Sequence, residues 1–294
     1  MFKGLFNRMY NGNPNRQDID PEDMPRNKFE LFFTTLGVRF GDLIKINMLY
    51  VVFILPALAW TVFNVMALLT LQSAAGTTES AMAQFAEQLI SLVQVYLLGM
   101  IPCLALAGPP SAGLVYVTRN WARDEHAWLW GDFKEQTLKN WKQSALVGGL
   151  VGVVLYIALI TVNLYDQLKA TAGWIWGLQL VFVLLVGLLV LSLMYAFPML
   201  VTYKVKFTQL VRNSVMLALG RLPFTLLFGA LTVFPLVLGL VIAMYTLYAV
   251  LGIMIYYAVI GFALSMFVIN SYTNATFDRL LKTEEDEPAP EEKE

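Results

Sequence analysis

Long apolar runs alternate with shorter polar segments along the 294 residues of the chain. Asp, Glu, Lys and Arg are missing from five stretches, which are 46–78, 88–118, 143–165, 170–203 and 222–277. A helix crosses a bilayer with about 20 apolar residues, so each of the first four stretches supplies one crossing and the fifth supplies two. The pattern predicts six membrane-spanning helices near residues 46–69, 89–107, 144–164, 174–202, 224–243 and 251–270.

Amphipathic segments precede each pair of predicted spans, at residues 28–45, 132–142 and 204–221. Apolar and charged residues at helical spacing are typical of helices that lie on the membrane surface. The first two segments open with a capping-box pair, Asn27 with Glu30 and Asp132 with Glu135, whereas the third has no such pair. This order suggests three helix-plus-hairpin repeats, as a hypothesis. Residues 1–10 fit either a further short surface helix or a frayed terminus.

Composition and charge place these helices in a membrane with a defined orientation. The chain is 58% hydrophobic and 14% charged, with a mean hydropathy of +0.62, whereas soluble domains carry about 25% charged residues. Of the 20 basic residues, all but Lys169 fall on one side of the predicted spans. The positive-inside rule makes that side cytoplasmic, with both termini inside. No secretory signal peptide is expected, because the N-terminus lacks an apolar core before a cleavage site.

We therefore expect an all-α polytopic membrane protein with six transmembrane helices and cytoplasmic interfacial helices. Its predicted parts are a cytoplasmic arm at 1–27, a six-span membrane domain at 28–281 and a disordered acidic tail at 282–294. We expect the lipid bilayer, and no nucleic acid, among its partners.

The central polar segment, residues 108–143, is the most plausible contact region for a partner. It opens with Gly108, Pro109, Pro110 and Gly113, which are predicted to stop the second span because proline lacks a backbone donor. It also holds the only His, at position 126. Candidate contacts to a partner or a lipid headgroup are Arg119, Arg123, Asp132, Trp141 and Lys142. The plainer interpretation of the two arginines is the positive-inside signal alone.

The predicted spans contain no charged residue, although coupled transporters usually keep one at membrane depth. The polar residues that remain are expected to form interhelical hydrogen bonds rather than ligand sites; they are Asn47, Asn64, Gln94, Asn163 and Gln179. Gly148 and Gly152 predict close helix packing. With one Cys, one His and no nucleophile, zinc or nucleotide motif, we expect no catalytic, cofactor or metal-binding residue and no enzyme activity.

The central segment resembles the YesL-like family of bacterial integral membrane proteins, whose function is unknown. The resemblance lies in the GPPSAGL string at 108–114, in Arg119 and Trp121, in Asp132–Phe133, in NWKQ at 140–143 and in Phe277-Asp278-Arg279. It extends over about residues 30–281. It implies a protein of the bacterial plasma membrane, often encoded beside carbohydrate ABC transporters, with no assigned catalytic residues.

From this resemblance and the basic face we expect a non-enzymatic accessory or regulatory partner of carbohydrate uptake. A transporter or channel for a neutral or lipid-like solute is the alternative, and it requires a polar cavity lined by Asn64, Gln94 or Gln179. An enzyme acting on lipid headgroups would bring Arg119, Arg123 and Asp132 to one pocket.

Overall fold

The computed structural model describes residues 27–168, 174–243, 246 and 248–286, so the predictions for the N-terminal arm and for most of the acidic tail lie outside it. The described residues form helices and connecting turns, with no strand among them. Six helical segments are long and apolar enough to cross a membrane. The all-α class and the six spans are therefore confirmed.

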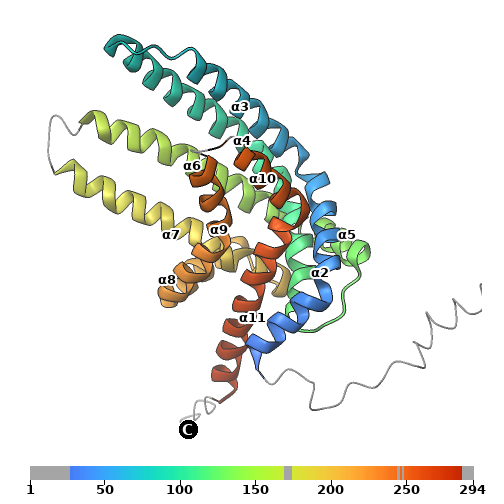
Figure 1. The fold of residues 1–294 in the computed structure, drawn as a ribbon. Helices are drawn as coiled ribbons and strands as arrows, with labels where there is room; N and C mark the ends of the chain where they lie inside the picture. The colour runs from blue at the N-terminus through green and yellow to red at the C-terminus, as the bar shows by residue number, and fades with distance from the viewer. Residues whose placement is uncertain (1–26, 169–173, 244–245, 247, 287–294) are drawn as a thin grey trace, which may run out of the picture.

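The helices follow one another in three groups, each an amphipathic helix followed by an apolar hairpin (Figure 1). The first group is α2 (Lys28–Phe53), α3 (Leu55–Ser73) and α4 (Glu79–Ala122), and the second is α5 (Leu129–Lys139), α6 (Trp141–Leu168) and α7 (Ile175–Thr202). The third is α8 (Phe207–Gly220), α9 (Leu222–Ala243), α10 (Tyr248–Tyr256), a π-helical turn η2 (Tyr257–Gly261) and α11 (Phe262–Asp286). The element order therefore has the form that the repeat hypothesis requires.

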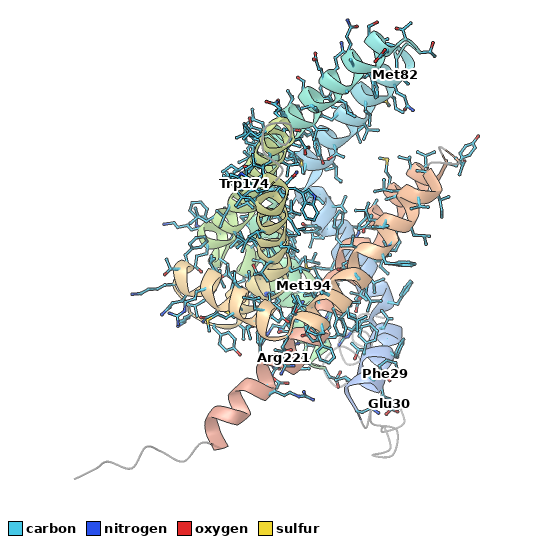
Figure 2. All side chains as sticks on the ribbon, turned by 90° about the vertical axis from the view of Figure 1, so that its left-hand side faces the viewer. Phe29, Glu30, Met82, Trp174, Met194 and Arg221 are labelled. Carbon is cyan, nitrogen blue, oxygen red and sulfur yellow. The ribbon has the colours of Figure 1, made fainter. Side chains whose placement is uncertain are left out.

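The hairpin tips lie at one end of the molecule and the amphipathic helices at the other. In Figure 1 the α3–α4 and α6–α7 tips point away from α5, α8 and the end of α11. Figure 2 shows the same polarity, with Met82 at one end and Phe29 and Arg221 at the other. The charged residues described near the tips, Glu79, Glu87 and Asp166, are all acidic. The basic residues that the structure describes belong to segments at the opposite end.

The first span begins later than predicted, because α2 continues through the expected start at Ile46 and ends at Phe53. Ile54 breaks the helix at φ −97° and ψ 7°, and Pro56 follows within the first two positions of α3. Proline is tolerated in the first turn of a helix, where its missing N–H would have no partner anyway. Pro56 thus lies at the start of the first span.

The predicted helix stop at Gly108, Pro109 and Pro110 is wrong, because α4 runs through both prolines and ends at Ala122. Each proline removes one backbone hydrogen bond, but neighbouring helices hold this part of α4 on several sides, and most residues from Ala107 to Trp121 are buried. Packing therefore outweighs the lost hydrogen bonds.

The stop lies fifteen residues further along, at a Schellman turn after Ala122. Asp124 N–H donates to the Trp121 carbonyl at 3.0 Å, and Glu125 N–H donates to the Asn120 carbonyl at 2.8 Å. Asp124 adopts the left-handed conformation, with φ 59°, that this motif requires at its turning residue. The last carbonyl groups of α4 are thus bonded by backbone N–H groups of the turn, and the helix ends there.

The glycines of the GPPSAG segment serve helix packing instead. A Cβ on Gly108 would lie 2.1 Å from the Ser144 carbonyl oxygen, and one on Gly148 would lie 2.1 Å from the Leu104 carbonyl oxygen. Gly152 approaches Ile101 in the same way. The predicted close packing of Gly148 and Gly152 is confirmed, and its partner is α4. Gly113 makes room for α5, with Phe133 and Thr137 against it.

The polar residue Asn47 joins α2 to the last span. Its amide nitrogen donates to the Tyr257 carbonyl at 2.9 Å and to the Ala258 carbonyl at 2.8 Å, and its oxygen accepts from Ala263 N–H at 2.9 Å. A π-helical turn leaves backbone groups out of the regular α-helical ladder. Asn47 binds these groups, which confirms its predicted role in an interhelical hydrogen bond.

Candidate functional site

The central segment contains α5, which begins three residues before the predicted cap. Its first residue is Leu129, and the Asp132 carboxylate accepts a hydrogen bond from Trp128 N–H at 2.8 Å. The predicted capping pair of Asp132 with Glu135 is therefore wrong, because Asp132 reaches back to the start of the helix from within its first turns. Asp132 is a structural residue of α5.

The two arginines at the end of α4 connect it to α11. Arg123 Nε donates to Glu125 at 2.9 Å and its Nη1 to Asp278 at 3.3 Å, while the backbone carbonyl of Arg119 accepts from Asn274 Nδ2 at 3.3 Å. The Arg123 pairs are partly exposed, and such pairs contribute less than about 1 kcal/mol each. They orient the end of α4 more than they stabilise it.

Arg119, Arg123 and Asp132 do not line a common cavity among those found in the described residues. Tyr203 lies near the arginines, just after α7. Burial raises the pKa of its hydroxyl, and the positive charges of Arg119 and Arg123 act in the opposite direction. Trp141 and Lys142 begin α6, with Lys142 Nζ 5.6 Å from the Trp141 ring centroid. The predicted contact residues therefore do not converge on one site.

A different part of the central segment forms a hollow with α2 at the basic end of the molecule. We call it the tryptophan hollow. It has a volume of about 540 Å³ and is lined by Arg39, Asp42, His126, Ala127, Trp128, Leu129, Trp130 and Gly131. Two of these side chains project strongly, since Trp128 is 71% exposed and Trp130 is 55% exposed.

The hollow combines a charged wall with an aromatic rim. Arg39 pairs with Asp42 at 3.5 Å and lies 6.0 Å from the ring centroid of Trp121, which is buried beneath it. The His126 and Trp128 rings meet edge to face at 5.0 Å. A partner could therefore receive both polar and stacking contacts here.

Sequence analysis expected a partner contact in the central segment, but none of its candidate contact residues lines the hollow. Of the lining residues, only His126 was singled out in the sequence. The pairing of that segment with Arg39 and Asp42 was not predicted, because about 85 residues separate them and two spans lie between. The only local signal was the (i, i+3) spacing of Arg39 and Asp42, which any solvated helix can have.

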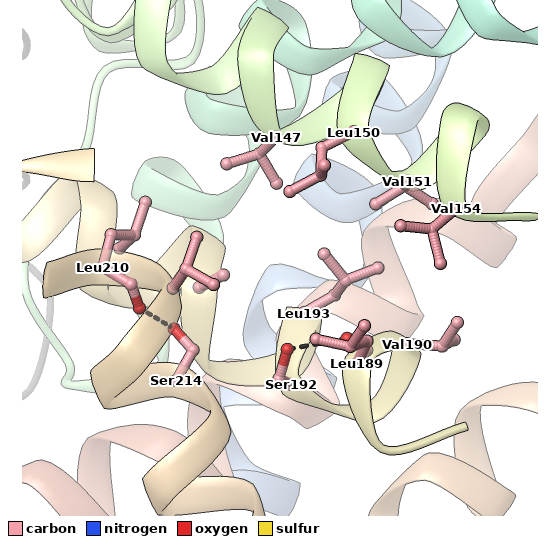
Figure 3. Close-up of a pocket in the computed structure, with 12 residues that line it drawn as sticks. Val147, Leu150, Val151, Val154, Leu189, Val190, Ser192, Leu193, Leu210 and Ser214 are labelled. Atoms are coloured by element: carbon pink, nitrogen blue, oxygen red, sulfur yellow. Dashed lines mark hydrogen bonds between the residues drawn. The ribbon is translucent and has the colours of Figure 1, made fainter. Parts of the chain in front are cut away.

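Two of the cavities beside the spans are lined mainly by apolar side chains. Figure 3 shows one of about 60 Å³ between α6, α7 and α8, where the two serines that line it, Ser192 and Ser214, donate to carbonyls of their own helices at 2.6 and 2.7 Å. Another, of about 550 Å³, opens between α3 and α4 beside Trp60 and Gly99. Both offer contact surface for hydrocarbon.

Two of the polar residues named for a transport pathway make local hydrogen bonds. Asn64 donates to the Trp60 carbonyl of its own helix at 2.8 Å, and Gln179 donates to Asp166 near the α6–α7 tip at 3.3 Å. None of the four cavities found in the described residues includes Asn64, Gln94 or Gln179. The part of the chain that the structure describes contains no group of three or more His, Cys, Asp or Glu that could hold a metal ion.

Comparison with known proteins links the chain to one family. Residues 43–163 match the model of the family described as "Protein of unknown function, DUF624". No curated protein and no solved structure matches the chain significantly. The matched region runs from the second half of α2 through α3, α4 and α5 into α6. YesL-like proteins belong to this family, so the match agrees with the resemblance over residues 43–163.

Proposed function

We propose that this protein is a non-enzymatic membrane accessory that docks onto a carbohydrate uptake system through the tryptophan hollow. The observation that carries the docking part is the exposure of Trp128 and Trp130 around a charged wall. Tryptophan and arginine are the residues that most often dominate binding energy at protein interfaces. Carbohydrate uptake as the process is supported by the family resemblance alone.

The proposal places the tryptophan hollow on the cytoplasmic face of the bacterial plasma membrane, with both termini on the same side. The distribution of basic residues supports this orientation. Exposed tryptophans at this level also suit the headgroup region of a bilayer. The Arg39–Asp42 pair and His126 favour a protein partner, because they give the surface a polar side that a lipid-facing belt does not need.

Site-specific photo-crosslinking in intact cells tests the proposal. A crosslinking residue at position 130 is expected to capture a component of a carbohydrate transporter, whereas one at Trp174, which is 73% exposed, should not. Trp174 immediately precedes α7, the second helix of a hairpin. We also expect Trp130→Ala to reduce the uptake of that sugar severalfold. Crosslinks without a transporter component, together with normal uptake in a deletion strain, would reject the proposal.

A further inference from the structure

A second surface at the basic end of the molecule combines cationic and aromatic side chains. It is a groove of about 280 Å³ between α9 and α11, which we call the α9–α11 groove. From α9 and the residue before it come Arg221, Phe224 and Phe228, and from α11 come Tyr272, Thr276 and Arg279. None of these residues belongs to the tryptophan hollow.

The helices α9 and α11 run in opposite directions. This determines where the cationic and the aromatic residues lie along the groove. Arg221 immediately precedes α9, so Phe224 and Phe228 follow it one and two turns into the apolar span. Arg279 lies two turns beyond Tyr272 on the way out of the last span. Arg221 and Arg279 are therefore both placed toward the basic end of the two helices, and the aromatic residues lie further along them.

The floor of the groove consists of stacked aromatic rings and a chain of hydrogen-bonded hydroxyl groups. The Tyr272 ring stacks on Phe228 with centroids 4.4 Å apart. The Tyr272 hydroxyl bonds that of Tyr195 at 3.0 Å, and Tyr195 bonds Thr225 at 2.8 Å. Thr225 in turn donates to the Arg221 carbonyl at 2.9 Å. The hydroxyl groups of the floor are thus bonded within the protein.

We propose that the α9–α11 groove binds the headgroup of an anionic phospholipid, with the phosphate between Arg221 and Arg279 and the first part of an acyl chain along Phe224 and Phe228. Guanidinium groups bind phosphate oxygens in a planar, two-pronged geometry. Basic pockets between spanning helices at the cytoplasmic surface suit anionic headgroups. A water-soluble phosphate would fill only the outer half of the groove.

The test is native mass spectrometry of the purified full-length protein, titrated with phosphatidylglycerol and, separately, with phosphatidylcholine. We expect tighter binding of phosphatidylglycerol, and a loss of roughly fivefold for each arginine removed in Arg221→Gln and Arg279→Gln. Arg212→Gln is the matched control, because Arg212 is an exposed arginine on α8 at the same end of the molecule. Binding of phosphatidylcholine should not change in any of the three.

Two further experiments distinguish lipid binding from the binding of free phosphate and from a general effect of surface charge. Phe224 is 55% exposed, so Phe224→Ala should fold normally, keep the helical circular dichroism and still weaken phosphatidylglycerol binding severalfold. Inorganic phosphate in excess should not displace the lipid. Displacement by phosphate, or an equal loss in Arg212→Gln, would overturn the proposal.

Discussion

The spanning helices α4 and α6 pack together at residues that lack a Cβ. Gly108 of α4 and Gly148 of α6 each lie against a backbone carbonyl of the other helix. A Cβ at either position would overlap that carbonyl. Because backbone atoms cannot move aside as a flexible side chain can, any added atom has to push the helices apart. These glycines therefore set the spacing of the α4–α6 pair.

Neighbouring glycines on α6 provide a matched test of this spacing. Gly148→Ala places a methyl group against the Leu104 carbonyl, so we expect a loss of about 1–3 kcal/mol, seen as a lower melting temperature in detergent. Gly149→Ala meets only Ala105 Cβ at 3.5 Å, an ordinary contact, and should leave the melting temperature nearly unchanged. Equal effects of the two changes would show that helix propensity, and not the crossing, determines the result.

Sequence analysis predicted the role of a residue correctly where that role depends on a pattern within its own helix. It failed where the role depends on contacts with segments that are distant in the sequence. Gly148 and Gly152 were recognised because a four-residue spacing of small residues is a local pattern. Gly108, Pro109 and Pro110 were interpreted as a stop because proline costs its own helix a hydrogen bond. That cost is local and visible, whereas the burial that offsets it comes from segments far away in the sequence.

At the scale of elements, each of the three amphipathic helices has a side chain that bonds to backbone in its first turn. Asn27 accepts from Glu30 N–H at 2.8 Å at the start of α2, as predicted. Asp132 accepts from Trp128 N–H in α5. In α8, where no capping pair was expected, Gln209 Oε1 accepts from Lys206 N–H at 3.1 Å. The starts of the three groups are thus more alike in structure than in sequence.

Removing the α5 bond tests which acidic residue begins that helix. Asp132→Ala should leave Trp128 N–H without its partner and destabilise the first turn by about 1 kcal/mol, so that the amides of residues 128–131 exchange with deuterium about fivefold faster. Glu135→Ala is the control, because Glu135 is exposed and lies in the second turn. If the same amides exchanged faster in Glu135→Ala, the capping pair of Asp132 with Glu135 that the sequence predicted would be supported instead.

Element boundaries were harder to predict than the elements themselves, because several residues in each segment can cap a helix. Asp132 with Glu135 has the spacing of a capping box, and only the position of Trp128 in space shows that Asp132 reaches backwards. The apolar runs, by contrast, leave little choice. The third, fourth and fifth spans begin and end within a few residues of their predicted limits.

At the scale of the whole molecule, acidic hairpin tips oppose a basic end. This polarity is the physical basis for the proposed orientation, since cytoplasmic loops retain Lys and Arg. It was predictable because charge and span order are both properties of the sequence alone. The tryptophan hollow and the α9–α11 groove were not, since each is made by two segments that come together only after the helices pack.

Cysteine accessibility in intact cells tests the orientation. In a Cys103→Ser background, Ala75→Cys in the α3–α4 turn should react with a membrane-impermeant maleimide added outside. Lys139→Cys, at the end of α5, should react only after the cells are permeabilised. Both positions are exposed, so a difference between them reports sidedness rather than burial. The reverse pattern would place the tryptophan hollow outside the cell.

The close crossing of α4 and α6 also has an evolutionary consequence. A helix pair at this distance accepts only the smallest residue at each contact, whereas positions that face lipid accept any apolar residue of similar size. Substitutions should therefore accumulate on the lipid-facing surfaces and leave the crossing unchanged. The family match over residues 43–163 includes both partners of this crossing and ends before α7. Among chains that match this family model, Gly108, Gly148 and Gly152 should therefore vary less than residues on the lipid-facing surfaces.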